Sequence, residues 1–221
     1  MKKEIRPVEN FTKIRLKDFG TLYLTQGEEE ALTIEADAQV LDELTSEVRD
    51  GALLLGIAED WRDRIGKGIS SVFSGEQNKV IYHLTVKELE SVSISGNCNL
   101  ECESLRSENL EIKVSGLGDL KFMHLDCSKL DLRISGRGEF TAAGRADQQK
   151  IRISGSGEVM AGELAGQTLR IVISGQGNAT VRVEESLDIT ISGLGQVNYY
   201  GRPKLHQVIS GLGKSKRLND E

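Results

Sequence analysis

Three carboxylates recur at one position of a repeated phrase, a spacing that could serve metal chemistry. Asp119, Glu139 and Glu158 each follow a Gly-x-Gly turn in three successive copies of that phrase. If the copies stack as parallel strands about 4.8 Å apart, their oxygens come close enough to bind Ca²⁺, which prefers oxygen ligands. A solvated outer face of a sheet explains the same pattern more simply. We therefore assign no metal site and keep these three residues as calcium candidates.

A second group could serve polysaccharide cleavage, because it combines basic side chains with carboxylates. Arg133, Arg152 and Arg170 occupy outward positions of successive copies, near Asp131 and Glu111. A lyase needs grouped carboxylates and a basic residue on one face. Exposed sheets, however, also pair opposite charges across their strands. We expect no enzyme activity, no catalytic residue and no cofactor, and we keep a polysaccharide-active enzyme as the alternative.

The remaining reactive residue types form no recognisable site. The odd number of cysteines, without Cys-x-x-Cys spacing, gives neither a disulfide framework nor a zinc site. Cys102 falls in an inward register and is expected in the core, whereas Cys98 and Cys127 are expected to be exposed. The histidines occupy different positions of the repeat, so a metal trio is not expected; they are His83, His124 and His206.

Composition and charge exclude several classes of function. The net charge of −6 argues against nucleic-acid binding, which needs a basic surface. No run of about 18 apolar residues is present, so no transmembrane segment is expected. The start of the chain lacks the apolar region of a signal peptide. We expect an extracytoplasmic protein, periplasmic or at the cell surface, if a leader was removed, and a cytoplasmic one if Met1 is the native start.

All these residues are positioned by an internal repeat. An aliphatic-Ser-Gly phrase occurs seven times, with its serines separated by 20, 20, 19, 20, 18 and 18 residues. Apolar and polar residues alternate before each serine and again after the glycines, and a period of two predicts strands with one buried face. The phrases begin at Ile94, Val114, Ile134, Ile153, Ile173, Ile191 and Ile209.

The near-constant spacing predicts an all-β fold, a right-handed parallel β-helix with about 18–20 residues per coil. One coil cannot bury its apolar face alone, so the coils must stack and share a core. Stacking predicts three columns of inward side chains. The first column is Leu110, Leu130, Gln149, Leu169, Leu187 and Leu205; the second is Val92, Ile112, Leu132, Ile151, Ile171, Ile189 and Gln207; the third consists of the aliphatic residues that open the phrases.

The Ser-Gly-x-Gly phrase is expected to be a structural corner where every coil bends. Glycine permits both a positive φ and a close approach of backbones. The first copy departs from the pattern, because Cys98 stands where the second glycine would be. The corner residues are Ser115, Gly116, Gly118, Ser135, Gly136, Gly138, Ser154, Gly155, Gly157, Ser174, Gly175, Gly177, Ser192, Gly193 and Gly195.

The chain is expected to form one β-helical domain over residues 1–221. Residues 1–90 read as a less regular β-rich portion with an excursion at 59–78. Within it, Asp37 is expected to cap a short helical turn over residues 38–44, and Asp50-Gly51 predicts a tight turn between two strands. Residues 91–214 form the regular coils, and residues 215–221 form a polar tail that keeps the last coil from exposing a bare sheet edge.

Segments along most of the chain resemble the bacterial autotransporter-adhesin head domain, also called the head GIN domain. The resemblance implies a β-helical fold and, usually, export beyond the cytoplasmic membrane. It implies no known activity and supplies no catalytic residues. The segments that carry it are Phe11-Thr12-Lys13-Ile14, Leu22-Tyr23-Leu24-Thr25-Gln26-Gly27, Ile34-Glu35-Ala36-Asp37, Val48-Arg49-Asp50-Gly51-Ala52-Leu53, Leu89 to Gly96 and the later Ser-Gly-x-Gly copies.

Together these features favour a non-catalytic binding or structural module of the cell envelope. An adhesin-like module of this kind would present a rigid β face to a glycan or an envelope protein, and the sequence does not select between these partners. Besides the enzyme, a self-assembling envelope element is the other alternative, and the charged residues near the C-terminus speak against it.

Overall fold

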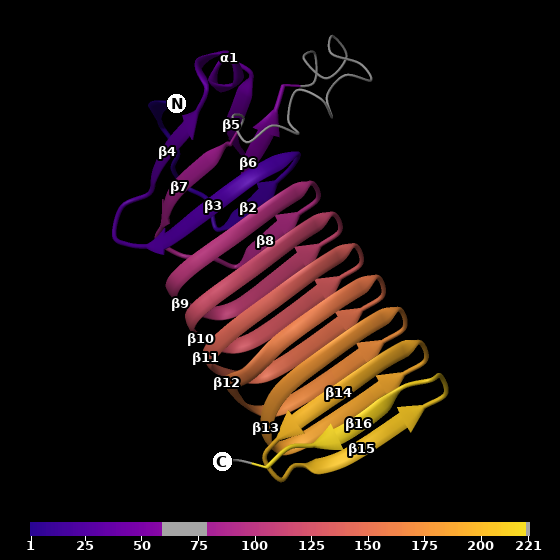
Figure 1. Cartoon of the computed structure of the whole chain (residues 1–221). Helices are drawn as coiled ribbons and strands as arrows, with labels where there is room; N and C mark the ends of the chain where they lie inside the picture. Colours follow the sequence, from indigo (N-terminus) through magenta and orange to yellow (C-terminus); the bar gives the residue numbers. More distant parts are fainter. Residues whose placement is uncertain (59–78, 220–221) are drawn as a thin grey trace.

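The protein is a solenoid of stacked β coils. The computed structural model describes residues 1–58 and 79–219. Five long strands of 16 to 18 residues each make almost one whole coil, and each pairs in parallel with the next (Figure 1). They are β9 (Asn97–Val114), β10 (Leu117–Ile134), β11 (Arg137–Ile153), β12 (Ser156–Ile173) and β13 (Gln176–Ile191). The predicted parallel β-helix is therefore confirmed. The residues between the two alternating segments of each repeat are part of the same strand.

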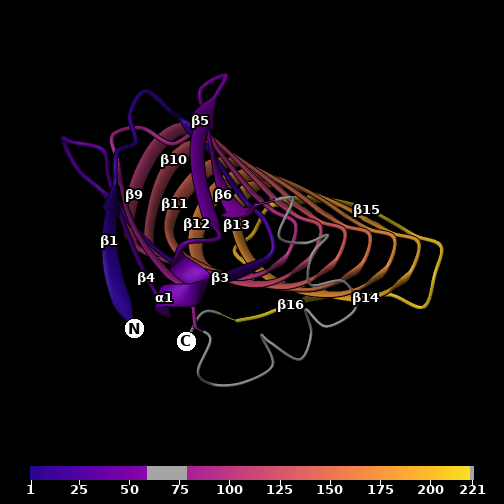
Figure 2. The same cartoon turned by 90° about the horizontal axis from the view of Figure 1, so that it is seen from above.

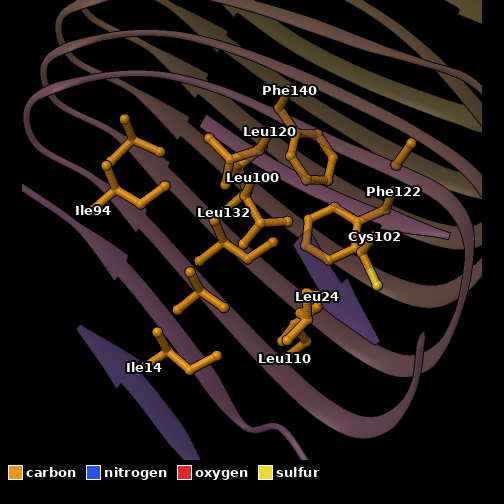
Figure 3. Packing of buried hydrophobic residues seen from close by; sticks show 14 of the residues in the cluster. Ile14, Leu24, Ile94, Leu100, Cys102, Leu110, Leu120, Phe122, Leu132 and Phe140 are labelled. Atoms are coloured by element: carbon orange, nitrogen blue, oxygen red, sulfur yellow. The ribbon is translucent and has the colours of Figure 1, made fainter. Parts of the chain in front are cut away.

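The predicted columns of inward side chains are present in the predicted register. Leu132 of β10, for example, lies opposite Ile112 of β9 and Ile151 of β11. Each of these three side chains is fully buried, and Figure 3 shows side chains from several coils gathered inside the solenoid. Burying one such side chain contributes roughly 1.5–3 kcal/mol. The shared core is therefore the main stabilising element of the fold.

The glycines of the corners are required for close backbone approach. A Cβ on Gly136 would lie 2.0 Å from the carbonyl oxygen of Gly116, and one on Gly155 would lie 2.0 Å from that of Gly136. No corner glycine is among the glycines of positive φ in the described chain, which are Gly20, Gly51, Gly144 and Gly201. Glycine was expected at these corners for two reasons. The expectation of a positive φ is wrong, and the expectation of a close approach between backbones is right.

The N-terminal portion closes one end of the solenoid with a mixture of parallel and antiparallel strands. Two short strands continue the coil faces in parallel, since β2 pairs with β6 and β8, and β3 pairs with β7 and β9. Three pairs are antiparallel: β1 with β4, β4 with β7, and β5 with β6. The elements are β1 (Lys2–Arg6), β2 (Lys13–Leu16), β3 (Phe19–Gln26), β4 (Ala31–Ala36), β5 (Leu44–Arg49), β6 (Ala52–Ile57), β7 (Ile81–Val86) and β8 (Ser91–Ile94).

Two local expectations for this portion have different outcomes. The helical turn is shorter than predicted, because α1 spans Ala38–Leu41 and the Asp37 side chain makes no capping hydrogen bond. The turn at Asp50-Gly51 is confirmed, since both residues have positive φ values, of 51° and 70°, between the antiparallel strands β5 and β6. The excursion expected at 59–78 lies outside the described residues.

The other end of the solenoid is formed by three short strands that complete the last coils. They are β14 (Leu194–Tyr200), β15 (Lys204–Ile209) and β16 (Lys214–Arg217). Strand β15 pairs with β13, and β16 pairs with β14, both in parallel. Residues predicted as the start of a polar tail therefore form most of β16. In Figure 2 the successive coils are seen behind one another, and Figure 1 shows this end opposite α1.

The two glycines of one corner provide a matched test of the stacking contact. We expect Gly155→Ala to lower the free energy of unfolding by about 3 kcal/mol, because its new methyl group meets the Gly136 carbonyl oxygen, which belongs to backbone. Gly157→Ala should cost less, about 1 kcal/mol, because the nearest atoms, from 3.1 Å, are methyl groups of isoleucine side chains and not backbone. Urea unfolding of both variants checks this. Equal losses would contradict it.

Candidate functional site

An open groove of about 1680 Å³ is present on the described surface. It runs along one side of the solenoid, where the middle parts of β9 to β12 bend, and it continues to the loop before β8 at one end and to β13 at the other. Because consecutive coils contribute equivalent positions to it, the groove is lined by rows of side chains, one per coil. It offers an extended surface for contact with a partner.

One row of the groove alternates in charge. Arg106 of β9, Asp126 of β10 and Arg145 of β11 are register neighbours, and all three are exposed. The Arg106 Nε donates to Asp126 Oδ2 at 3.2 Å, whereas the Arg145 Nε donates to Asp147 Oδ1 at 2.6 Å. A parallel row is mostly uncharged and polar, and consists of Asn109, Lys129, Gln148, Thr168 and Ser186. The groove therefore offers both hydrogen-bonding groups and charges of both signs.

The charged residues considered for lyase chemistry are brought together, but as ion pairs. Asp131 accepts from Arg133 Nε at 3.1 Å and from Arg152 Nη1 at 3.0 Å, and Glu111 lies 3.4 Å from Arg133. Partial burial works to raise the pKa of Asp131, but the hydrogen bonds and charges of the two arginines outweigh it and hold that pKa below its usual value. A carboxylate held ionised in this way cannot act as a general acid near neutral pH. Arg170 of β12 is the register neighbour of Lys150 in β11 and of Asp188 in β13.

The calcium candidates line a second, smaller groove of about 620 Å³ along the glycine corners. Asp119, Glu139 and Glu158 are direct neighbours in register, as predicted. Within the described residues, however, no three His, Cys, Asp or Glu side chains converge in an arrangement that could hold a metal ion. The structure thus places the three carboxylates in a row and does not gather them around one point. Calcium binding stays a prediction.

The cysteines are all in the core. Cys102 was expected there, but the expected exposure of Cys98 and Cys127 is wrong, since their exposed fractions are 0% and 4%. Cys98 takes the inward position of the second corner glycine, and Cys127 follows a bend at which two successive residues point outward. Burial raises the pKa to about 12 for Cys98 and Cys127 and to about 11 for Cys102.

Gln149 is a buried polar residue. Its place in the first column was predicted from the sequence, but the reason for a glutamine there was not. It replaces a leucine in the first column and is 4% exposed. Its Nε2 donates to the carbonyl oxygens of Ala146 at 3.2 Å and Leu164 at 3.5 Å, and its buried Oε1 has no hydrogen-bond partner. Gly166 leaves room for it, because a Cβ there would lie 2.4 Å from Nε2. Gln149 therefore ties the bend of two coils together beneath the groove.

The fold and the groove define a β-solenoid that presents rows of polar side chains on a rigid face. Residues 10–203 match the family described as "Putative auto-transporter adhesin, head GIN domain". The chain belongs to this family. No curated protein sequence matches it. None of the helices in the described part of the chain is long and apolar enough to cross a membrane.

Solved structures of similar proteins share this fold over nearly their whole length. A "putative adhesin" from Bacteroides fragilis has 25% sequence identity and a TM-score of 0.85, over 99% of this chain and 96% of that one. A "putative adhesin" from Parabacteroides merdae has 20% identity and a TM-score of 0.70, over 98% and 95%. A "putative lipid binding protein" from Parabacteroides distasonis has 21% identity and a TM-score of 0.70, over 98% and 96%. The last two show a likeness of fold alone.

The ion pairs of Asp131 predict a pH-dependent contribution to stability. Because its pKa is lowered in the folded state, the contribution is fully present above the unfolded pKa and is lost as the pH falls through the folded pKa. Asp131→Asn should therefore lower the free energy of unfolding at pH 7 by up to about 1 kcal/mol, and by progressively less below about pH 4. Denaturant unfolding at several pH values measures this. A difference that stays constant down to pH 2 would contradict it.

The burial of the cysteines predicts that the native protein is inert to thiol reagents. At pH 8 we expect no rapid reaction of any of the three thiols with an aromatic disulfide reagent, and reaction of all three after unfolding in urea. The absorbance of the thiolate released from the reagent gives the number of cysteines that have reacted. Fast reaction of even one thiol in the folded protein would show that a cysteine is accessible.

Proposed function

We propose that this protein is a non-catalytic, adhesin-like binding module that takes an extended partner along the groove. The observation that carries the proposal is the extent of the groove, whose equivalent polar positions repeat from β9 to β13. Rows that repeat about every 4.8 Å suit a partner that is itself long and regular. The family to which the chain belongs supports the adhesin-like role.

The charges of the groove support binding rather than catalysis. Asp126, Asp131 and Glu111 each have a basic partner within 3.4 Å, so each is already engaged in an ion pair. Catalysis by general acid and base needs two groups whose environments separate their pKa values, with one of them kept protonated. No observation in the groove favours the polysaccharide-active enzyme over a binding module.

The chemistry of the lining describes the partner. The rows combine amides, hydroxyls and charges of both signs, and none of the described residues that line the groove is Phe, Tyr or Trp. Such a surface binds by hydrogen bonds and ion pairs rather than by ring stacking, and it fits either a glycan chain or an extended segment of an envelope protein. Both need a location outside the cytoplasm, at the cell surface or in the periplasm. An encoded leader upstream of this chain would support that location.

The proposal predicts that charge removal in the groove abolishes partner binding. We expect the wild-type protein to bind a defined glycan on an array or a purified envelope protein on a chip. The double variant Arg106→Ala/Arg145→Ala should bind the same partner at least tenfold more weakly, because a hydrogen bond to a charged group is worth about 1.5–3 kcal/mol. The readout is the equilibrium response at increasing protein concentration.

A matched control removes two cations outside the groove, in the variant Arg15→Ala/Lys121→Ala. This variant should bind like the wild type. If both double variants lose affinity equally, the partner senses net charge and the groove is not the site. If uronate polymers yield unsaturated products with the wild type, the protein is an enzyme and the proposal fails.

A further inference from the structure

The C-terminal end of the solenoid differs in charge from the rest of the molecule. The sequence contains no Asp or Glu between residues 189 and 219, although the whole chain has a net charge of −6. Five cations fall in this stretch. Four of them have no ion pair within the described residues, and these are Arg202, Lys204, Lys214 and Lys216. The fifth, Arg217, donates from Nε to the Gly201 carbonyl oxygen at 2.8 Å. The rod is thus acidic overall and basic at one end.

The same end exposes apolar side chains. Leu205 and Ile209 are the last members of the first and third columns, and they are 38% and 37% exposed because no further coil of the described chain covers them. Val208 is 51% exposed, and Leu212, in the last corner, is 83% exposed. We call these four residues and the five cations the C-terminal end surface. It lies at the end of the solenoid opposite α1 (Figure 1).

The second core column closes with polar residues at this end, which argues against continuation by a second copy. The second column ends in Gln207 instead of an aliphatic residue, and its Oε1 accepts a hydrogen bond from Ser215 Oγ at 2.5 Å. Ser215 in turn lies beneath Val197, in another inward position. A copy stacked end to end through the same surface would also bring like charges together. Terminal repeats with a polar outer face are the common way in which solenoids end.

We propose that the C-terminal end surface docks on an anionic lipid bilayer. Basic residues next to a negatively charged bilayer each contribute favourable electrostatic energy, and exposed aliphatic side chains among them insert at the level of the headgroups. A soluble polyanion would use the cations but would leave Leu212 and Val208 in water. The acidic remainder of the rod is repelled by the same bilayer, so the solenoid stands on its basic end with the groove directed away from the surface.

Sedimentation with vesicles tests the proposal on the full chain. Wild-type protein should bind vesicles made of equal parts phosphatidylcholine and phosphatidylglycerol, should bind pure phosphatidylcholine at least tenfold more weakly, and should be released by raised sodium chloride. Binding to the mixed vesicles should fall at least tenfold in the triple variant Lys204→Glu/Lys214→Glu/Lys216→Glu. Leu212→Ser, which removes the apolar side chain and leaves the charge unchanged, should also weaken it, which a free polyanion site would not require.

The matched control reverses three exposed cations elsewhere, in Lys2→Glu/Lys79→Glu/Lys121→Glu, and has the same net charge as the triple variant of the end. It should bind the mixed vesicles at least several-fold better than that variant. Equal binding of the two would overturn the proposal, as would failure of the wild type to sediment with anionic vesicles. Light scattering tests whether the surface binds a second copy of the chain. A doubled mass that is lost only in the triple variant of the end would overturn the proposal in favour of that second copy. The groove plays no part in these measurements, so they are independent of the proposed function.

Discussion

The fold depends on how closely the backbone of one coil can approach that of the next at the corner. A methyl group on the first glycine of each corner would lie 2.0–2.2 Å from a carbonyl oxygen of the coil before it, from Gly96 to Gly211. This distance is far inside van der Waals contact, so only glycine fits. Because the corners coincide, the strands that leave them start in register. The inward columns and the outward rows follow from that register.

The same constraint makes the outer surface regular enough to bind. Each row repeats one chemical position from coil to coil, and the bend in the middle of every long strand hollows the row into a groove. Ion pairs such as that of Asp131 with Arg152 link neighbouring coils and hold the row in place. The two ends have no such repetition. One is covered by α1 and antiparallel strands, and the other ends in a basic surface with exposed aliphatic side chains.

Much of the fold could be predicted from the sequence, because a period of two and a period of about twenty residues are local signals. All three columns, including Gln149 and Gln207, have the predicted members. The burial of Cys127 could not be predicted, since the alternation shifts at a bend where Met123 and His124 both point outward. The antiparallel pairing of β4 with β1 and β7 depends on contacts between distant segments. The groove depends on the bends, which no residue type marks.

The central claim is that equivalent corners lie directly over one another, and a distance between two labels tests it most directly. Leu117 and Leu194 occupy the same exposed corner position four coils apart. Spin labels on Leu117→Cys and Leu194→Cys should give a single narrow distance. Four strand spacings place the two backbones about 19 Å apart. A broad distribution, or a distance beyond about 30 Å, would contradict stacked coils.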